Sequence, residues 1–179
     1  AGIDFQQVVS GVDEDVLKVE AAVEKCMPEQ IAIRLAVAKA KAVSQQHPKV
    51  FVIGADQILE CRGQLFDKPK NLKEALAHLN IFQGTSHQLI SAVTLTLDGK
   101  TLWTHAEIAT LTMRTLKNED LERYLKRSGP EVLESVGVYR LEGIGATLFD
   151  KIDGDYFTIL GLPLLPLLAC LREHKVISS

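Results

Sequence analysis

In the stretch Val50-Phe51-Val52-Ile53-Gly54-Ala55-Asp56-Gln57, four apolar residues run into two small residues and an acid. The apolar run predicts a fully buried strand that ends at Gly54. Asp56 would then lie just beyond the carboxyl end of that strand. A carboxylate at such a place destabilises the fold unless it is paired, hydrogen-bonded or metal-bound, so Asp56 is a candidate functional residue. The alternative is that Asp56 caps the turn that follows.

The segments around this strand predict helices and further strands. An Ala-rich stretch with apolar residues at helical spacing predicts a helix over residues 28–44. The sequence Asn71-Leu72-Lys73-Glu74 matches a capping box at the start of a second helix. Asp98-Gly99 suits a two-residue hairpin turn between strands over residues 89–97 and 101–113. We therefore expect an α/β fold with a mixed, twisted sheet, whose ligands bind at the carboxyl ends of the strands.

Composition narrows the class of protein. The chain has 179 residues, a formal net charge of −3 and three cysteines. This length suits a single domain over residues 1–179, with two lobes around one cleft. Because no basic stripe is present, nucleic acid is not an expected partner. Scattered cysteines favour a reducing compartment, and the most apolar stretch, residues 159–171, is too short to span a bilayer. A cytoplasmic protein without a membrane partner is expected.

Charged residues elsewhere in the chain are further candidates for a functional role. Lys39 lies on the flank of the predicted helix over residues 28–44, where the alternative is a side chain that extends to water. Lys68 precedes Pro69, which stiffens the loop and gives the ammonium a fixed direction. The acidic trio Asp13-Glu14-Asp15 is either a solvated loop or a source of an oxygen ligand for Mg²⁺. The sequence has no P-loop, G-x-G-x-x-G, H-E-x-x-H or G-x-S-x-G pattern.

The order and spacing of several short motifs resemble the Maf family of nucleoside triphosphate pyrophosphatases over nearly the whole chain. The resemblance implies a Maf/Ham1 (inosine triphosphatase-like) α/β fold, often a homodimer, that hydrolyses a nucleoside triphosphate to the monophosphate and pyrophosphate. The matching segments are Val12-Asp13-Glu14, Leu35-Ala36-Val37-Ala38-Lys39-Ala40, Val52-Ile53-Gly54-Ala55-Asp56-Gln57, Lys68-Pro69, Gly84 through His87, and Gly154-Asp155-Tyr156 to Gly161-Leu162-Pro163-Leu164.

The resemblance also implies roles for single residues. By position, Asp56 matches the family's proposed proton acceptor, and Glu14, Lys39 and Lys68 match its polar cleft residues. Attack of water on the α-phosphate builds negative charge on the phosphate oxygens, which cations stabilise. Lys39 and Lys68 are therefore expected to bind the substrate phosphates. Glu14 and Asp56 are expected to hold a divalent metal ion, Mg²⁺ or Mn²⁺.

Two departures from the family pattern bear on the substrate. Many members that act on dTTP and UTP have Thr after the catalytic Asp and Gln in a Y-x-x-Q-G segment, where this chain has Gln57 and Glu142. That combination looks more like the branch that acts on 7-methyl-GTP. A carboxylate accepts hydrogen bonds from guanine N1–H and N2 and complements the positive charge of a 7-methylated ring. Gln57 and Glu142 are therefore expected to bind the base, unless Glu142 is simply an exposed turn residue.

A dTTP/UTP pyrophosphatase remains the alternative within the same reaction class, and two functions of other kinds stay open at this point. One is a nucleotide-binding regulator of septum formation without turnover. The other is a house-cleaning enzyme for damaged purine triphosphates, as in the related inosine triphosphatase family. The family's Ser/Arg-rich phosphate loop, roughly S-x-S-P-R-R, does not precede Ala1, and Thr85 stands where the family often has arginine. This N-terminally incomplete chain is therefore expected to be weakly active.

Overall fold

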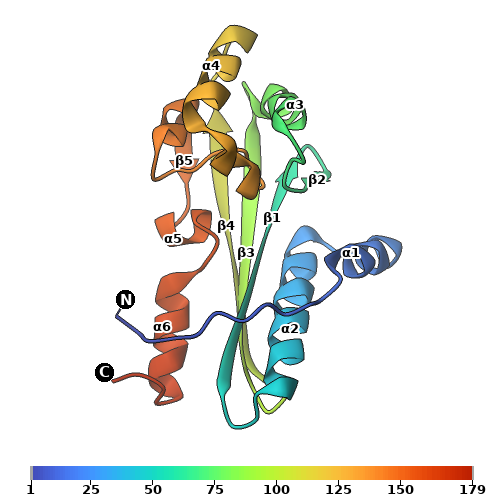
Figure 1. Cartoon of the computed structure of the whole chain (residues 1–179), viewed down its shortest axis with the longest axis vertical. Helices are drawn as coiled ribbons and strands as arrows, with labels where there is room; N and C mark the ends of the chain where they lie inside the picture. The colour runs from blue at the N-terminus through green and yellow to red at the C-terminus, as the bar shows by residue number, and fades with distance from the viewer. Residues whose placement is uncertain (1, 179) are drawn as a thin grey trace. The chain divides into compact units, whose positions relative to one another are not determined.

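The computed structural model describes residues 2–178, which form both helices and a β-sheet, as in other α/β proteins (Figure 1). The chain folds into two compact units. Unit 1 comprises residues 2–57, 91–107 and 161–178, and unit 2 comprises residues 58–90 and 108–160. The elements in chain order are α1 (Glu14–Val23), α2 (Pro28–Gln46), β1 (Phe51–Cys61), β2 (Gln64–Phe66), α3 (Leu72–Phe82), β3 (Ser86–Leu97), β4 (Lys100–Met113), α4 (Asn118–Ser128), the short 3-10 helices η1 (Pro130–Glu134) and η2 (Ile144–Leu148), β5 (Phe149–Asp153), α5 (Tyr156–Ile159) and α6 (Leu164–Glu173).

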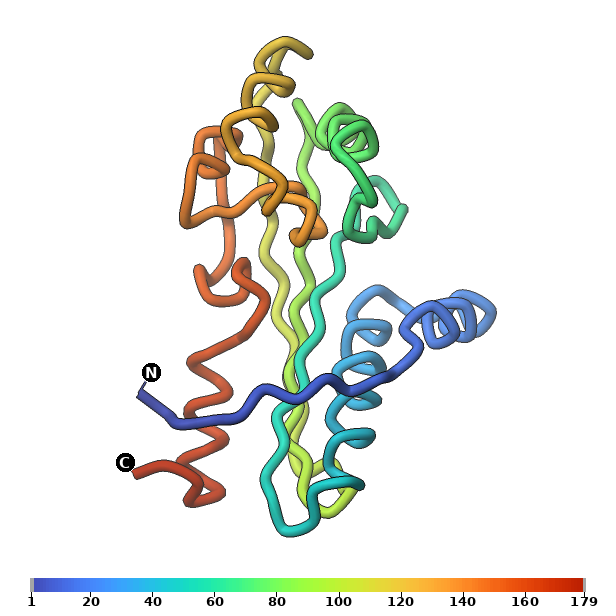
Figure 2. The backbone as a smooth tube through the Cα atoms, viewed as in Figure 1, coloured from blue at the N-terminus to red at the C-terminus, as the bar shows by residue number. Residues whose placement is uncertain are grey.

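The five strands form one antiparallel sheet in the order β2-β1-β3-β4-β5. Asp98 and Gly99, at φ of 49° and 75°, make the predicted two-residue turn between β3 and β4, which Figure 2 traces. The prediction of a mixed sheet is wrong. Antiparallel neighbours need only a tight turn, and β1–β2 and β3–β4 are both joined in this way, whereas parallel pairs need long crossovers.

Strand β1 overturns a second prediction, that the strand ends at Gly54. The strand runs to Cys61, so Asp56 lies within it rather than beyond its carboxyl end. Gly54 lies inside the strand, at a position where α2 packs too closely for a larger residue. A Cβ at residue 54 would collide with the carbonyl oxygen of Ala36 and lie 2.7 Å from the Cβ of Ala40. Glycine inside a strand often marks such a close approach of backbones.

In unit 1, α2 and α6 lie on either side of the strands (Figures 1 and 2). Helix α2 contacts β1 at Gly54. Helix α6 buries Leu167, Cys170 and Leu171 against Val93 and Leu95 of β3. The strands of this unit therefore have a helix on each face, and each face can present its own set of polar side chains.

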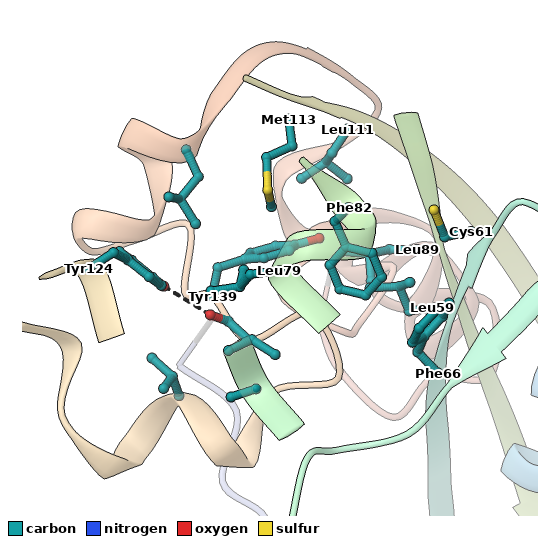
Figure 3. Packing of buried hydrophobic residues seen from close by; sticks show 14 of the residues in the cluster. Leu59, Cys61, Phe66, Leu79, Phe82, Leu89, Leu111, Met113, Tyr124 and Tyr139 are labelled. Carbon is teal, nitrogen blue, oxygen red and sulfur yellow. Dashed lines mark hydrogen bonds between the residues drawn. The ribbon is translucent and has the colours of Figure 1, made fainter. Parts of the chain in front are cut away.

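Unit 2 has a larger apolar core, drawn in Figure 3. It includes the fully buried side chains of Leu79, Phe82 and Leu111. Two tyrosines complete it, and the Tyr124 hydroxyl donates a hydrogen bond of 3.0 Å to the carbonyl oxygen of Val138. Within the described residues, no helix of either unit is long and apolar enough to cross a bilayer.

Candidate active site

The structure brings three of the predicted residues together in unit 1. The Nζ atom of Lys39 lies 2.5 Å from Oδ1 of Asp56 and 2.7 Å from Oε1 of Glu14. The side chain of Asp56 is only 7% exposed, whereas that of Glu14 is 40% exposed. One ammonium group therefore bridges a buried carboxylate and a more accessible one.

Three elements supply these side chains. Asp56 comes from the middle of β1, Lys39 from α2, and Glu14 is the first residue of α1. Asp13 begins α1 as its cap, because its carboxylate accepts a hydrogen bond of 3.2 Å from the N–H of Val16. The close packing of α2 on β1 brings Lys39 against the strand face that carries Asp56. Lys39 therefore pairs with buried charge instead of extending to water.

Burial and charge act in opposite directions on these pKa values. Burial raises the pKa of Asp56 above that of an ordinary aspartate, and the hydrogen bond from Lys39 and its positive charge oppose that rise. Burial also lowers the pKa of Lys39, but the hydrogen bonds to Asp56 and Glu14 outweigh it, so the pKa of Lys39 is raised. Lys39 consequently stays cationic at neutral pH.

Lys18 joins this cluster, although the sequence analysis did not single it out. Its Nζ atom lies 3.9 Å from Oε2 of Glu14, one helical turn earlier. The i,i+4 spacing of an acid and a lysine was the available signal, because such residues are neighbours on a helix surface. The cluster therefore holds two lysines and two carboxylates.

Gln57 follows Asp56 in the chain but has different neighbours. Its Nε2 donates a hydrogen bond of 2.9 Å to the hydroxyl of Ser91 on β3. Its amide group also borders Gly161, where a Cβ would lie 3.9 Å from the amide carbon. Successive side chains of a strand point to opposite faces of the sheet. Gln57 therefore belongs to the sheet face opposite Asp56, and neither Ser91 nor Gly161 was identified from sequence as its neighbour.

Lys68 and Glu142 belong to unit 2. The Nζ atom of Lys68, on a side chain 58% exposed, lies 3.7 Å from Oε2 of Glu134. The Oε1 atom of Glu142 accepts a hydrogen bond of 3.0 Å from Nε of Arg140, whose Nη1 also donates to Glu131 at 3.0 Å. Glu142 is exposed, as the turn-residue alternative supposes, but its negative charge is balanced by a guanidinium group that the sequence analysis did not identify.

Comparison with known proteins identifies the family of this chain. The family model described as "Maf-like protein" matches residues 1–174. The chain belongs to the Maf family.

Curated relatives match this Maf-family chain over all or nearly all of its length. A protein of Brucella suis named 7-methyl-GTP pyrophosphatase is 49% identical over 179 residues, which cover 100% of this chain and 90% of the relative. A protein of Rhizobium etli with the same name is 48% identical over 181 residues, with the same two coverages. A protein of Granulibacter bethesdensis named nucleoside triphosphate pyrophosphatase is 45% identical over 178 residues, covering 99% of this chain and 90% of the relative.

The carboxylates of this Maf domain suit a metal ion that is shared with a substrate. Among residues 2–178, no group of three or more His, Cys, Asp or Glu side chains is arranged to hold a metal ion. Asp56 and Glu14 offer two carboxylates on either side of one ammonium group. Mg²⁺ commonly takes one or two carboxylates and completes its shell with substrate phosphates and water. Asp56 and Glu14 are therefore the residues that could hold such an ion, with its other ligands supplied from outside the protein.

Proposed function

We propose that this chain is a nucleoside triphosphate pyrophosphatase whose catalytic residue is Asp56. The observation that carries the proposal is the buried Asp56 carboxylate, 2.5 Å from an ammonium group that also contacts Glu14. A buried base beside a fixed cation suits an attack of water on a phosphate. The names of the relatives from Brucella suis and Granulibacter bethesdensis support the same reaction.

Asp56 and Lys39 have different roles in the proposed reaction. Asp56 accepts a proton from the attacking water, whose oxygen forms a bond to the α-phosphorus. The bond from that phosphorus to the bridging oxygen breaks, and pyrophosphate leaves with the electron pair. Lys39 has three N–H donors. Two of them serve Asp56 and Glu14, which leaves one for a phosphate oxygen as negative charge develops there.

Asp56 and Glu14 are also the residues that would hold Mg²⁺ or Mn²⁺. When bound, such an ion neutralises charge on the phosphate oxygens. Without a metal ion, Lys39 keeps the carboxylates of Asp56 and Glu14 close together, since its ammonium group contacts both. Lys18 supports Glu14 from the next turn of α1.

The base is proposed to be 7-methylguanine, with Gln57 and Glu142 as the residues that select it. Ser91 holds the Gln57 amide in one orientation through the hydrogen bond to its Nε2. A carboxylate at Glu142 matches the N1–H and N2 donors and the positive charge of 7-methylguanine. Because Arg140 partly neutralises Glu142, selection over dTTP and UTP is expected to be moderate. Lys68 is proposed to contact the phosphates.

Further features are proposed from the family resemblance. They are a Maf/Ham1 type of fold with two lobes around a cleft, a homodimer, a cytoplasmic location and a house-cleaning role. A nucleotide-binding regulator of septum formation without turnover is the alternative to the enzyme.

The experiment is a measurement of pyrophosphate release from 7-methyl-GTP, GTP, dTTP and UTP in ¹⁸O-labelled water. We expect 7-methyl-GTP to have the highest kcat/KM and the label to appear in the monophosphate, because water attacks the α-phosphorus. Label in the pyrophosphate would contradict the proposed attack. Nucleotide binding without pyrophosphate release from any substrate would favour the regulator.

The role of Glu142 has a matched control in Glu131, which contacts the same arginine. We expect Glu142→Gln to reduce the preference for 7-methyl-GTP over UTP about tenfold, which corresponds to the loss of roughly one charged hydrogen bond to the base. Glu131→Gln should leave that preference unchanged. Equal effects of the two substitutions would show that Glu142 acts only through Arg140.

A further inference from the structure

Unit 2 contains a pocket of about 290 Å³ that none of the proposed catalytic or base-selecting residues lines. Three arginines line it: Arg114, which follows β4, and Arg123 and Arg127 of α4. Asp120 is the single carboxylate among the lining residues, which gives them a formal charge of +2. A net positive charge concentrated around one concavity attracts small anions.

Arg114 is held firmly in place. Its backbone N–H donates a hydrogen bond of 2.9 Å to the carbonyl oxygen of Leu148. Its side-chain Nη1 donates another of 2.9 Å to the carbonyl oxygen of Thr147. A guanidinium group has five N–H donors in a planar fork, so one bond to Thr147 leaves several for a ligand. The group is thus oriented before any ligand arrives, which reduces the entropy lost on binding.

Helix α4 adds the two other cations. Arg123 and Arg127 are four residues apart and therefore lie on the same side of the helix. Asp120 orients Arg123 through an ion pair of 3.0 Å between Oδ1 and Nη1. A phosphate group has oxygens on several sides, so guanidinium groups from two elements can bind it at once.

Apart from Thr147, the rest of the pocket lining is apolar or aromatic. Ile144 and Leu148 of η2 line it beside the ring of Tyr124. Tyr124 is nearly buried, and its hydroxyl is occupied by the hydrogen bond to Val138 that is drawn in Figure 3. The pocket therefore combines charged groups with an apolar wall, a combination typical of sites for small organic ligands.

We propose that this pocket binds a small phosphate-bearing anion, with the phosphate on Arg114, Arg123 and Arg127. The shared chemistry fits both inorganic pyrophosphate and a nucleoside monophosphate. Pyrophosphate would use the arginines alone, whereas a monophosphate would also place its ribose or base against Ile144 and Leu148. The proposal does not depend on the catalytic role of Asp56.

The test is an NMR titration of the full chain that follows the Nε–H signals of the three arginines and the methyl signals of Ile144 and Leu148. The ligands are inorganic pyrophosphate and GMP in separate titrations. We expect saturable shifts of the arginine signals. Methyl shifts with GMP alone would identify a monophosphate site, and their absence with both ligands would identify a pyrophosphate site.

Two variants distinguish specific binding in this pocket from nonspecific electrostatic attraction of anions to the protein. Arg123→Gln combined with Arg127→Gln should weaken binding at least about tenfold, because two charge-assisted hydrogen bonds are lost. Lys126→Gln removes a charge from the same helix outside the pocket and should change the affinity less than about twofold. Shifts that do not saturate, or equal losses in the two variants, would overturn the proposal.

Discussion

Lys39 is the residue of the candidate active site that contacts both carboxylates. Its ammonium group contacts Asp56 at 2.5 Å and Glu14 at 2.7 Å. Without it, the buried Asp56 would lose its nearest cation while remaining out of water. A buried charge without a partner destabilises a fold more than a formed pair stabilises it. Lys39 therefore supports the fold as well as the proposed chemistry.

The substitution Lys39→Gln should lower the free energy of unfolding at pH 8 by about 1 to 3 kcal/mol. The physical reason is the uncompensated carboxylate of Asp56. The double variant with Asp56→Asn should be destabilised less than the sum of the single variants, because the pair is coupled. Urea unfolding of the wild type, both single variants and the double variant measures this coupling.

Lys18→Gln is the control for this cycle, because Lys18 contacts Glu14 more distantly, at 3.9 Å. Its effect should stay within about 0.5 kcal/mol, as for most surface pairs. Strict additivity of Lys39→Gln and Asp56→Asn would show that the short contact contributes no coupling energy.

At the scale of elements, the site depends on the close approach of α2 to β1. Gly54 permits that approach, since a side chain there would meet Ala36 and Ala40. A small residue is needed because the backbone of α2, not a flexible side chain, lies opposite. The distance between the helix and the strand in turn sets the contact of Lys39 with Asp56.

We expect Gly54→Ala to destabilise the chain by about 1 to 3 kcal/mol, through overpacking between α2 and β1. Pyrophosphate release should fall as well, because the helix carrying Lys39 must shift. The control is Gly143→Ala, at φ −122°, where a Cβ would have its nearest neighbour at 3.7 Å. Thermal unfolding of both variants measures the difference. A Gly54→Ala chain as stable as Gly143→Ala would contradict the packing argument.

The helices and strands of the structure also show how much of this fold the sequence alone predicts. Helix α2 and the β3–β4 hairpin were predicted correctly, because helical periodicity and an Asp-Gly turn are local signals. The extension of β1 past Gly54 was missed, since a glycine inside a strand looks like an end until the helix packed on it is known. Strand direction depends on which strands become neighbours, and local sequence does not determine that.

The site was predictable to a similar degree. Asp56, Lys39 and Glu14 were expected to act together from the family resemblance, and the structure brings them into contact. The hydrogen bond of Gln57 to Ser91 joins residues 34 positions apart on neighbouring strands, so no sequence pattern reports it. The pairing of Glu142 with Arg140 lies within a turn whose side-chain directions only the structure gives.

At the scale of the whole molecule, a buried histidine links stability to pH. His87 is 1% exposed, and its Nε2 lies 2.7 Å from the Tyr139 hydroxyl. Its Nδ1 has no hydrogen-bond partner among the described residues. Burial lowers the pKa of His87 to about 4, below its ordinary 6.5. The unfolded chain therefore binds a proton on His87 at a higher pH than the folded chain does.

The sign of this effect follows from the lowered pKa. The contribution of His87 is fully present above pH 6.5 and is lost as the pH falls toward 4. Between pH 7 and pH 5 we expect His87 to reduce the free energy of unfolding by about 2 kcal/mol. Urea unfolding at both values, for the wild type and His87→Gln, measures it. The variant should lose less stability over this range, and an equal loss in both proteins would exclude His87 as the cause.

The most direct test of the central claim is the rate of pyrophosphate release by Asp56→Asn, compared with Asp150→Asn. Asp150 is an exposed residue of β5 and provides the same chemical change elsewhere. If Asp56 is the general base, its variant should bind nucleotide and stay folded, but release pyrophosphate about 10²- to 10⁴-fold more slowly. Asp150→Asn should match the wild type. Equal rates for the two variants would contradict the assignment of Asp56 as the catalytic residue.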